Sequence, residues 1–220
     1  MIGGRTEYSE TVAEGVSLKI VDIVEPGESK FERGLTLAAG SSVRVVCIVL
    51  GSAEVNYSIK LQGEGAEAEI YSLYRIDGRD KAALSVNVSH NVPCCRSYLL
   101  AKGIAGGEAK GDFSALTYVA PDAQQTVAEQ LIRSLQLSPE AQITATQQLE
   151  IYADDVKCSH GATVGQLDPE QIYYMRQRGI PEQEAYRLQI AGFVNEIISK
   201  IEEEELERSI HESTGLQYGI

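Results

Sequence analysis

Cys158 and His160 are the two residues whose types and spacing best fit metal chemistry. They lie two positions apart, so an extended chain places both side chains on one face of a strand. A thiolate and an imidazole are ligands that zinc, iron and iron–sulfur clusters accept. Two ligands do not complete a metal site, so the others would come from elsewhere in the chain or from another subunit. Val156 has the same phase, and the alternative is that this face is simply part of the core.

The two other histidines are weaker candidates. His90 continues the alternating apolar series of residues 84–88 and lies close to Cys94, which makes it a further candidate metal ligand. Hydrogen bonding to the backbone at a strand end is the favoured interpretation of His90. His211 falls in an acidic helical segment, and we expect it to be solvated.

Motifs for classical catalysis are absent from the sequence. It contains no G-x-x-x-x-G-K-[ST] loop for nucleotides, no G-x-S-x-G nucleophile elbow and no H-E-x-x-H zinc motif. We therefore expect no nucleotide hydrolysis and no enzymatic activity from this chain alone. A small zinc-dependent enzyme is a weaker alternative.

Composition limits the partners and the compartment. The 220 residues are 43% hydrophobic, enough for a sizeable core, and carry a net charge of −13. Such a surface repels phosphates and anionic lipids, which argues against nucleic acid and membrane surfaces as partners. The longest apolar run, Val45–Leu50, is far shorter than the about 20 residues that span a bilayer. Without an apolar leader at residues 1–7, the four cysteines predict free thiols in a cytoplasmic, reducing environment.

Residues 16 to about 165 are expected to form strand after strand. The alternating series are Val43, Val45, Cys47 and Val49; Val55, Tyr57, Ile59 and Leu61; Ala68, Ile70, Ser72, Tyr74 and Ile76; Leu84, Val86, Val88 and His90; Phe113 and Ala115; Leu149 and Ile151; and Val156, Cys158 and His160. Turn signals follow one another roughly every dozen residues, as in a β-sandwich, a barrel or a β-solenoid. The residues show no strict repeat that would choose among these three folds.

The segment Asp122–Gln148 is polar and rich in glutamine. We expect solvated strands and turns here, with the glutamine side chains facing water. An interface of stacked amides is the less favoured alternative.

The pattern changes to helical at Asp168. Asp168 is a predicted N-cap followed by Pro169 at the first helical position, and the helix should end at Gly179. A second helix should begin at Pro181. Its predicted apolar stripe consists of Ala185, Leu188, Ala191, Val194, Ile198 and Ile201. The acidic run at 202–205 is expected to be a solvated helical stretch, and the tail beyond Gly215 is expected to be frayed.

The segment 149–165, which contains the run Lys157-Cys158-Ser159-His160-Gly161-Ala162-Thr163-Val164-Gly165, resembles the signature of the SufB/SufD family. The continuation that fits the same pattern consists of Leu167-Asp168, Tyr174, Arg178-Gly179-Ile180, Glu184-Ala185 and Phe193. Cys-Ser-His-Gly stands where SufB-like chains carry a histidine–glutamate pair, so the resemblance is closer to SufD. The resemblance is specific from about residue 84 onward, where the run 89–94 also fits. Upstream of residue 84 it consists only of a general richness in predicted strands.

The resemblance implies a right-handed parallel β-helix, or β-solenoid, over residues 10–166, followed by a C-terminal α-helical subdomain over 168–214. It implies a non-catalytic scaffold subunit in cytosolic iron–sulfur cluster assembly, which pairs through its β-helix with a SufB-like subunit or with a second copy of itself. A SufC-like ATPase of the ABC type would dock on the C-terminal helices and supply the nucleotide chemistry. The residues expected to bind this partner are Tyr173, Tyr174, Arg176, Arg178, Gly179, Ile180 and Phe193.

The resemblance also gives His160 a role. It implies that this histidine binds iron or a transient iron–sulfur cluster at a subunit interface, with Cys158 as a second candidate ligand and no nucleotide bound. No cysteine lies between Cys95 and Cys158, so we expect that the chain is not a sulfur acceptor. At 220 residues we expect a short form without the family's N-terminal helical extension. The alternative is a self-associating structural β-solenoid without cluster chemistry.

Overall fold

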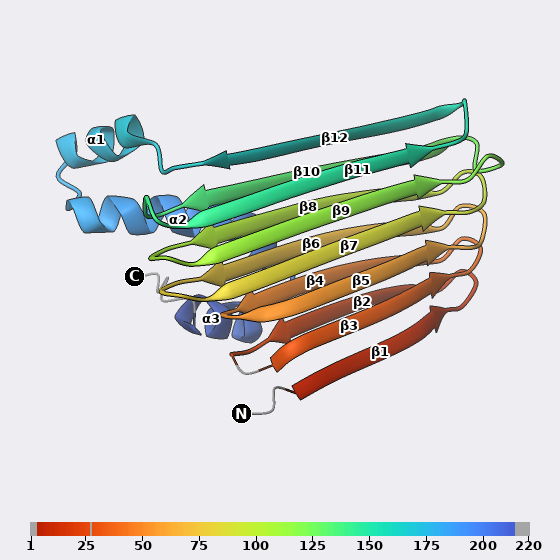
Figure 1. Cartoon of the computed structure of the whole chain (residues 1–220), viewed down its shortest axis with the longest axis horizontal. Helices are drawn as coiled ribbons and strands as arrows, with labels where there is room; N and C mark the ends of the chain where they lie inside the picture. The colour runs from red at the N-terminus through yellow and green to blue at the C-terminus, as the bar shows by residue number, and fades with distance from the viewer. Residues whose placement is uncertain (1–3, 27, 214–220) are drawn as a thin grey trace.

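The computed structural model of the chain describes residues 4–26 and 28–213. Within these residues the chain forms two six-stranded parallel sheets that face one another, and three helices (Figure 1). The first sheet contains, in spatial order, β1 (Gly4–Val12), β3 (Glu28–Leu37), β5 (Ala53–Leu61), β7 (Lys81–His90), β9 (Lys110–Val119) and β11 (Gln142–Ile151). The second contains β12 (Val156–Gly165), β10 (Thr126–Gln136), β8 (Arg96–Ala105), β6 (Glu67–Ile76), β4 (Ser42–Leu50) and β2 (Ser17–Val24).

Consecutive strands lie in opposite sheets, and each strand pairs in parallel with the strand two places later. The chain therefore coils through the two sheets, from the coil of β1 and β2 to the coil of β11 and β12. In Figure 1 the coil rises from bottom to top while the front strands run to the right and the back strands to the left, which is a right-handed path. The predicted right-handed parallel β-helix is confirmed.

The interior of the solenoid is built from the alternating residues. In β5, Val55, Tyr57, Ile59 and Leu61 all point inward and are at most 1% exposed. The coils stack in register, so inward residues that are paired in the ladder form columns across successive strands. The alternation predicted for residues 43–90 is thus confirmed, because each apolar series faces this shared core. Within the described residues the solenoid extends from Gly4 to Gly165, whereas the expected bounds were residues 10 and 166.

The chain leaves the solenoid through a helix whose start and end agree with the prediction. α1 (Pro169–Gln177) begins after Asp168, whose Oδ1 accepts a hydrogen bond from the backbone N–H of Glu170 at 2.8 Å. Gly179, with φ of +87°, follows the end of the helix. α2 (Glu182–Ile198) begins directly after Pro181, also as predicted.

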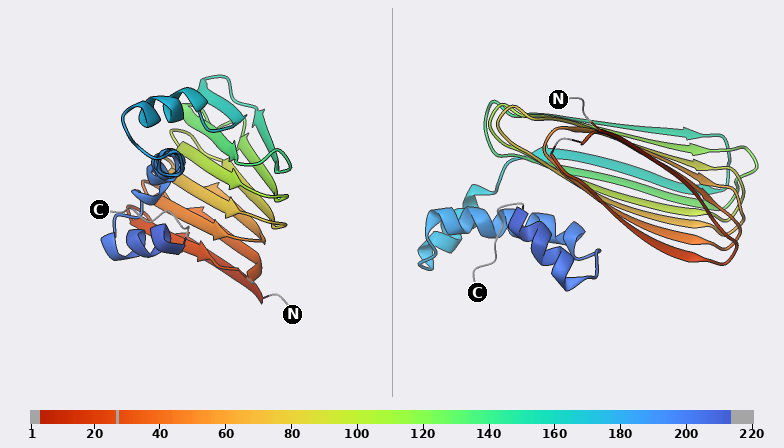
Figure 2. Two further views of the ribbon diagram at one scale, coloured as in Figure 1. Left: turned by 90° about the vertical axis from the view of Figure 1, so that its left-hand side faces the viewer. Right: turned by 90° about the horizontal axis from the view of Figure 1, so that it is seen from below.

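α2 and α3 (Glu204–Ser213) lie against the outer face of the second sheet (Figure 2). The buried residues Val194, Ile197 and Ile198 of α2 pack in one cluster with outward-facing residues of the sheet, among them Val46 and Leu73. This contact explains why β4 and β6 contain nearly continuous buried runs, because both faces of these strands are covered. The outer face of the first sheet carries no helix in the described part of the chain.

Three expectations about the helical part were wrong in whole or in part. Leu188 was placed in the buried stripe but is 40% exposed. Glu202 is 55% exposed, as expected for a solvated residue, but it lies between α2 and α3 with φ of +56° and not in a helix, and its carboxylate forms ion pairs with Lys19 and Arg44 of the second sheet. His211, expected to be solvated, is only 9% exposed. The prediction for the tail beyond Gly215 falls outside the described residues.

No helix in residues 4–26 and 28–213 is both long enough and apolar enough to cross a membrane.

Candidate functional site

Cys158 and His160 lie on the inner face of β12, in the last coil of the solenoid. In the parallel ladder with β10, Cys158 is beside Ala128 and His160 is beside Gln130. Within the described residues β12 pairs only with β10 and β11 pairs only with β9, so both strands have a free edge at the top of Figure 1. The shared face predicted from the spacing is therefore confirmed, and it lies at the open end of the stack.

The two side chains differ in exposure. His160 is exposed, whereas Cys158 is half-buried and packs against a small apolar cluster that contains Val119 and Ala153. Burial raises the pKa of the Cys158 thiol above 9.0, and a hydrogen bond from the backbone at Ala128 opposes this shift only in part. The thiol is therefore protonated near neutral pH, and a bound metal ion is the agent that would remove its proton.

The residues described do not complete a metal site on their own. Among residues 4–26 and 28–213, no group of three or more His, Cys, Asp or Glu side chains is arranged to hold a metal ion. A metal at the open end would thus combine Cys158 and His160 with ligands from outside this part of the chain. In the ladder between β10 and β12, the polar side chain beside His160 is that of Gln130.

His90 is placed apart from this pair. It ends β7, two coils below β12, and its side chain is fully buried with Nε2 2.8 Å from Ser97 Oγ. The favoured interpretation gave it a backbone partner, and the structure gives it a side-chain hydroxyl. Burial lowers the pKa of His90 to about 4, so the ring is neutral at physiological pH. The structure does not bring His90 together with His160.

The expectation that the glutamine side chains of this segment face water is confirmed for Gln125, Gln142 and Gln148, which are exposed, and is wrong for Gln130. Gln130 is 2% exposed inside the solenoid, and its Nε2 donates a hydrogen bond to Thr117 Oγ1 at 2.6 Å. Gln147 donates from Nε2 to the backbone oxygen of Gln130 at 3.1 Å. Residue-based reasoning missed Gln130, although its phase with Ala128 and Ile132 in β10 was a usable signal.

The expected partner-binding residues fall into an exposed group and a covered group. Tyr173 and Tyr174 on α1 are 63% and 57% exposed, and the Arg178 guanidinium lies over the Tyr174 ring at 4.5 Å. Arg176 is exposed and forms an ion pair with Glu182 at 3.4 Å. These aromatic rings at the surface of α1 are features that a partner protein can contact.

Of the three remaining residues, Ile180 and Phe193 are partly covered by other parts of the chain. Ile180 is half-buried and Gly179 is exposed, both in the connection between α1 and α2. Phe193 of α2 packs against the cluster under the helices, and its ring lies 4.3 Å from Lys102 Nζ of β8. Phe193 therefore faces the solenoid, where it helps to attach α2.

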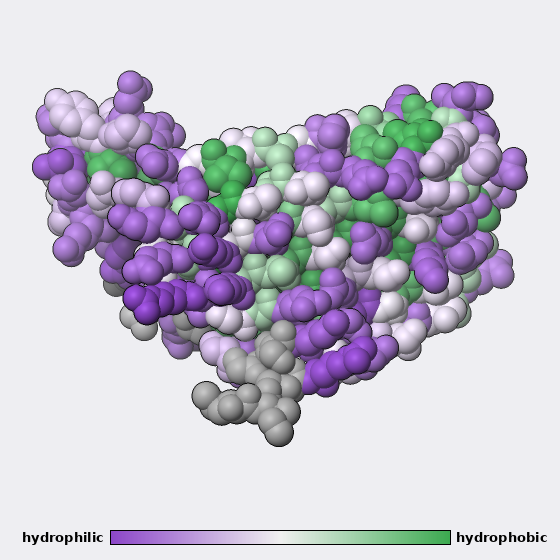
Figure 3. All heavy atoms as spheres, viewed as in Figure 1, coloured by the Kyte–Doolittle hydropathy of each residue, from purple (hydrophilic) through white to green (hydrophobic). Residues whose placement is uncertain are grey.

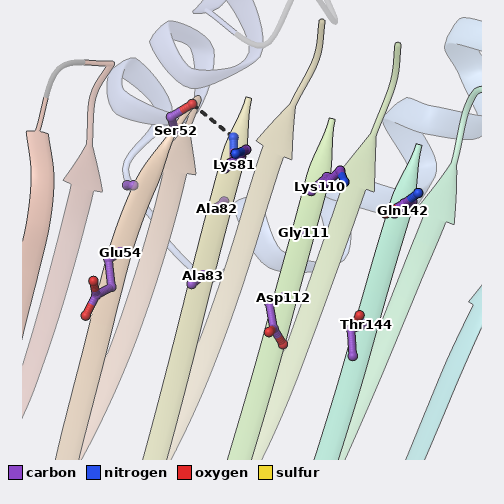
Figure 4. A pocket seen from close by; sticks show the side chains of 11 residues that line it. Ser52, Glu54, Lys81, Ala82, Ala83, Lys110, Gly111, Asp112, Gln142 and Thr144 are labelled. Atoms are coloured by element: carbon purple, nitrogen blue, oxygen red, sulfur yellow. Dashed lines mark hydrogen bonds between the residues drawn. The ribbon is translucent and has the colours of Figure 1, made fainter. Parts of the chain in front are cut away.

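The outer face of the first sheet contains a separate shallow hollow of about 520 Å³. Figure 4 shows Lys81, Lys110 and Gln142 side by side at the starts of β7, β9 and β11. Glu54 and Asp112 lie in the next row along the strands. None of the described residues that line this hollow carries a thiol or an imidazole, so their chemistry does not suit a soft metal ion.

Exposed apolar residues also gather near the open end of the solenoid. In Figure 3 one of several hydrophobic patches lies at the upper right of the first sheet, where β9 and β11 end. Ile151 at the end of β11 is 37% exposed, and Tyr152 beside it is 60% exposed. Val164, on the inner face of β12, is 40% exposed. These side chains would be shielded from water if another chain covered the last coil.

The sequence matches a known family over most of its length. A family model described as "SUF system FeS cluster assembly, SufBD core domain" matches residues 11–193. The chain is 35% identical over 178 residues to the iron–sulfur cluster assembly protein SufD of Escherichia coli, a match that covers 80% of this chain and 42% of that protein. It is 34% identical over 163 residues to an iron–sulfur cluster assembly SufBD family protein of Synechocystis, covering 73% of this chain and 36% of that protein.

A third relative is the iron–sulfur cluster assembly protein SufD of Bacillus subtilis, 32% identical over 141 residues that cover 64% of this chain and 32% of that protein. The chain thus spans less than half the length of these curated relatives. The family match begins at residue 11, which corrects the expectation that the resemblance is specific only from about residue 84 onward.

Proposed function

The chain belongs to the SufBD core family of the SUF system for iron–sulfur cluster assembly, with SufD-type relatives, and from this membership we propose that it is a non-catalytic scaffold subunit of a cytoplasmic cluster-assembly complex. Iron or a nascent iron–sulfur cluster is its cargo, and it binds no nucleotide. One observation carries the proposal: Cys158 and His160 share the inner face of the last coil, whose two strands have free edges within the described residues.

Pairing through the solenoid follows from these free edges. An edge strand presents unpaired N–H and C=O groups to any strand that aligns with it. β11 and β12 both offer such an edge, and the exposed Ile151 and Val164 lie on them. A SufB-like subunit or a second copy of this chain would cover these groups and bring its own ligands to the open end.

Cys158 and His160 supply a soft and a borderline ligand to the cargo. The exposed imidazole of His160 can bind iron first, and the half-buried thiol of Cys158 becomes a ligand when the metal displaces its proton. The incomplete ligand set suits a transient site, because a cargo held by two residues of one chain is released when the second subunit withdraws its own ligands.

The helical subdomain is the proposed site for a SufC-like ATPase. Tyr173 and Tyr174 present two exposed rings on α1, and α2 joins this helix to the outer face of the second sheet. A movement of docked ATPases would therefore reach the solenoid through α2. We propose that this movement strains the paired scaffolds and opens or closes the cargo site at the last coil.

Reconstitution with iron and sulfide tests the scaffold role. The chain is purified with its partner subunit, and thiolate-to-iron charge-transfer absorption is recorded during the titration. His160→Ala is expected to lower the cluster yield strongly, and Cys158→Ser is expected to weaken the charge-transfer band. Ser159→Ala is the matched control, because Ser159 lies on the same strand, is exposed and faces outward. An undiminished cluster yield with His160→Ala contradicts the proposed ligand.

A structural solenoid without cluster chemistry is the second candidate function. The packing of Cys158 against Val119 and Ala153 favours it, because a thiol in an apolar cluster contributes to stability without any metal. The same titration separates the two functions. A purely structural chain would associate through its last coil and develop no charge-transfer absorption.

A further inference from the structure

One column of inward residues changes character at the open end of the solenoid. It begins with Ile20, Val45, Ile70 and Leu99, which stack on successive strands of the second sheet. The same column continues to Gln130 and then to His160. An apolar column thus ends in a buried carboxamide directly beneath the candidate ligand.

The carboxamide of Gln130 is fixed on one side only. Its Nε2 is bound to Thr117 Oγ1 across the interior, which leaves Oε1 as the free end of the group. Oε1 is buried and has no hydrogen-bond partner among the described residues. A buried carbonyl oxygen without a hydrogen-bond donor is energetically unfavourable. An N–H or O–H group from a neighbouring residue that donates to Oε1 would remove this cost.

His160 is the neighbour that can supply it. The two residues are directly paired in the β10–β12 ladder, and both side chains point inward, so their backbones are about 4.8 Å apart. The His160 imidazole is exposed, whereas the Gln130 side chain is buried and bound to Thr117. Rotation of the His160 side chain would bring a ring nitrogen toward Oε1 without movement of the strands.

We propose that Gln130 is a positioning residue that accepts an N–H hydrogen bond from the His160 ring and so selects its tautomer. The proposal rests on the ligand role of His160 put forward above. An amide oxygen can only accept, so the ring nitrogen that faces it carries the proton. The lone pair of the other nitrogen then points to the open end, where iron would bind. Histidines that bind metals generally donate their second ring N–H to such an acceptor.

Two substitutions at Gln130 separate this role from packing. Gln130→Met keeps the length of the side chain and removes the acceptor. Gln130→Glu retains an acceptor oxygen for His160, and the Thr117 hydroxyl can donate to its other oxygen. Gln147→Met is the matched control, because it removes a neighbouring amide at the same end and leaves Oε1 of Gln130 in place.

The first measurement is the tautomer of His160 in the full chain, read from ¹⁵N chemical shifts in long-range ¹H–¹⁵N spectra and assigned with His160→Gln. We expect one dominant tautomer in the wild type, in Gln130→Glu and in Gln147→Met, and a mixture of both in Gln130→Met. The second measurement is Fe(II) affinity, which Gln130→Met should lower about 10- to 100-fold while Gln130→Glu retains it.

Unchanged tautomer populations in Gln130→Met, or an equal change in Gln147→Met, overturn the proposal. If the wild type binds no iron, the ligand role fails, yet the tautomer measurement still decides the hydrogen bond between Gln130 and His160. If Gln130→Met does not fold, Thr117→Val replaces it, because it releases the carboxamide from its anchor and should likewise mix the tautomers.

Discussion

Lys102 of β8 and Glu196 of α2 form an ion pair at 2.5 Å beneath the helical subdomain. The Lys102 side chain is only 3% exposed, and its Nζ also donates to the backbone oxygen of Phe193 at 2.6 Å. Burial lowers the pKa of Lys102, and the hydrogen bond to Glu196 opposes that shift. The same hydrogen bond lowers the pKa of Glu196. One buried ammonium group thus ties α2 to the solenoid.

The two partners of this ion pair should not be equally important for stability. Glu196→Ala leaves the Lys102 ammonium buried with one acceptor fewer, and we expect the free energy of unfolding to fall by about 1–2 kcal/mol, since Glu196 itself is partly solvated. Lys102→Met removes the buried charge and keeps the apolar stem, so it should cost less than about 1 kcal/mol. Urea denaturation at neutral pH measures both.

A surface pair provides the control for these two variants. Glu184 and Arg187 form an ion pair on α2 with both side chains exposed, so Glu184→Ala should change the free energy of unfolding by less than about 0.5 kcal/mol. If Lys102→Met lowered the free energy of unfolding more than Glu196→Ala, the explanation would be wrong. The attraction between the two charges, and not the cost of a buried unpaired ammonium, would then be the main contribution of the pair.

The strands were easiest to predict from the sequence where an inward apolar series alternates with polar residues. Val55 to Leu61 in β5 is such a series, and one face of the strand meets the core while the other meets water. The parallel coil could not be derived this way. Period-two alternation is the same in a sandwich and in a solenoid, and the pairing of Val45 with Ile70 joins residues 25 positions apart.

The candidate site was predictable only in part for the same reason. The spacing of Cys158 and His160 fixes their common face, but their place at the open end depends on the stacking order of twelve strands in the described chain. Gln130 was misjudged because its polar type was given more weight than its phase. The ion pairs of Glu202 could not be predicted, because its partners, Lys19 and Arg44, belong to distant strands that no local pattern indicates.

His90 should make the stability of the fold depend on pH in the acidic range. Its pKa is about 4 in the folded chain, against an ordinary value of 6.5, because burial disfavours the charged ring. Above 6.5 the ring is neutral in both states and contributes no pH dependence. Between 6.5 and about 4 the unfolded chain binds a proton that the folded chain does not, so stability falls as the pH falls.

His90→Gln isolates this effect, because it removes the titrating ring and keeps a polar group near Ser97. The advantage of the wild type over His90→Gln in free energy of unfolding should shrink by about 3 kcal/mol between pH 7 and pH 4, at about 1.4 kcal/mol per pH unit. Denaturant titrations at four pH values measure the difference. A pH-independent difference would show that His90 is not the responsible group.

The four cysteines should react with iodoacetamide in two classes. Cys47 and Cys95 are buried, and burial raises the pKa of Cys47 to about 12, so both should resist labelling until the chain unfolds. Cys94 and Cys158 are half-buried and should be labelled in the native state. Because its thiol pKa is raised, labelling of Cys158 should accelerate about tenfold per pH unit above neutrality. Mass spectrometry of peptides from timed samples measures each rate.

Labelling of Cys158 also reports on the paired state. If a second subunit covers the last coil, Cys158 should become at least tenfold slower to react in the complex, while Cys94 keeps its rate. If docked ATPases move the scaffold as proposed, the labelling rate of Cys158 should change again when a non-hydrolysable nucleotide locks the ATPase dimer. Equal rates in the locked and unlocked complex would contradict the coupling between helices and cargo site.

Tyr173 and Tyr174 should matter for partner binding and not for folding. Each ring is more than half exposed on α1, so replacing both by serine removes little buried area, and the free energy of unfolding should change by less than about 1 kcal/mol. The same double variant should abolish co-purification of a SufC-like ATPase, because exposed aromatic residues are the usual anchors of such an interface. Pull-down from cells that express both proteins gives the readout.

Tyr152 is the matched control for this double variant. It is 60% exposed, as the two α1 rings are, but it follows β11 at the far end of the coil from the helices. Tyr152→Ser should leave ATPase co-purification intact and weaken only the pairing of the solenoids. If both variants lose the ATPase equally, the loss reflects scaffold pairing, and docking on α1 is wrong. If the α1 variant retains the ATPase, the partner binds elsewhere on the chain.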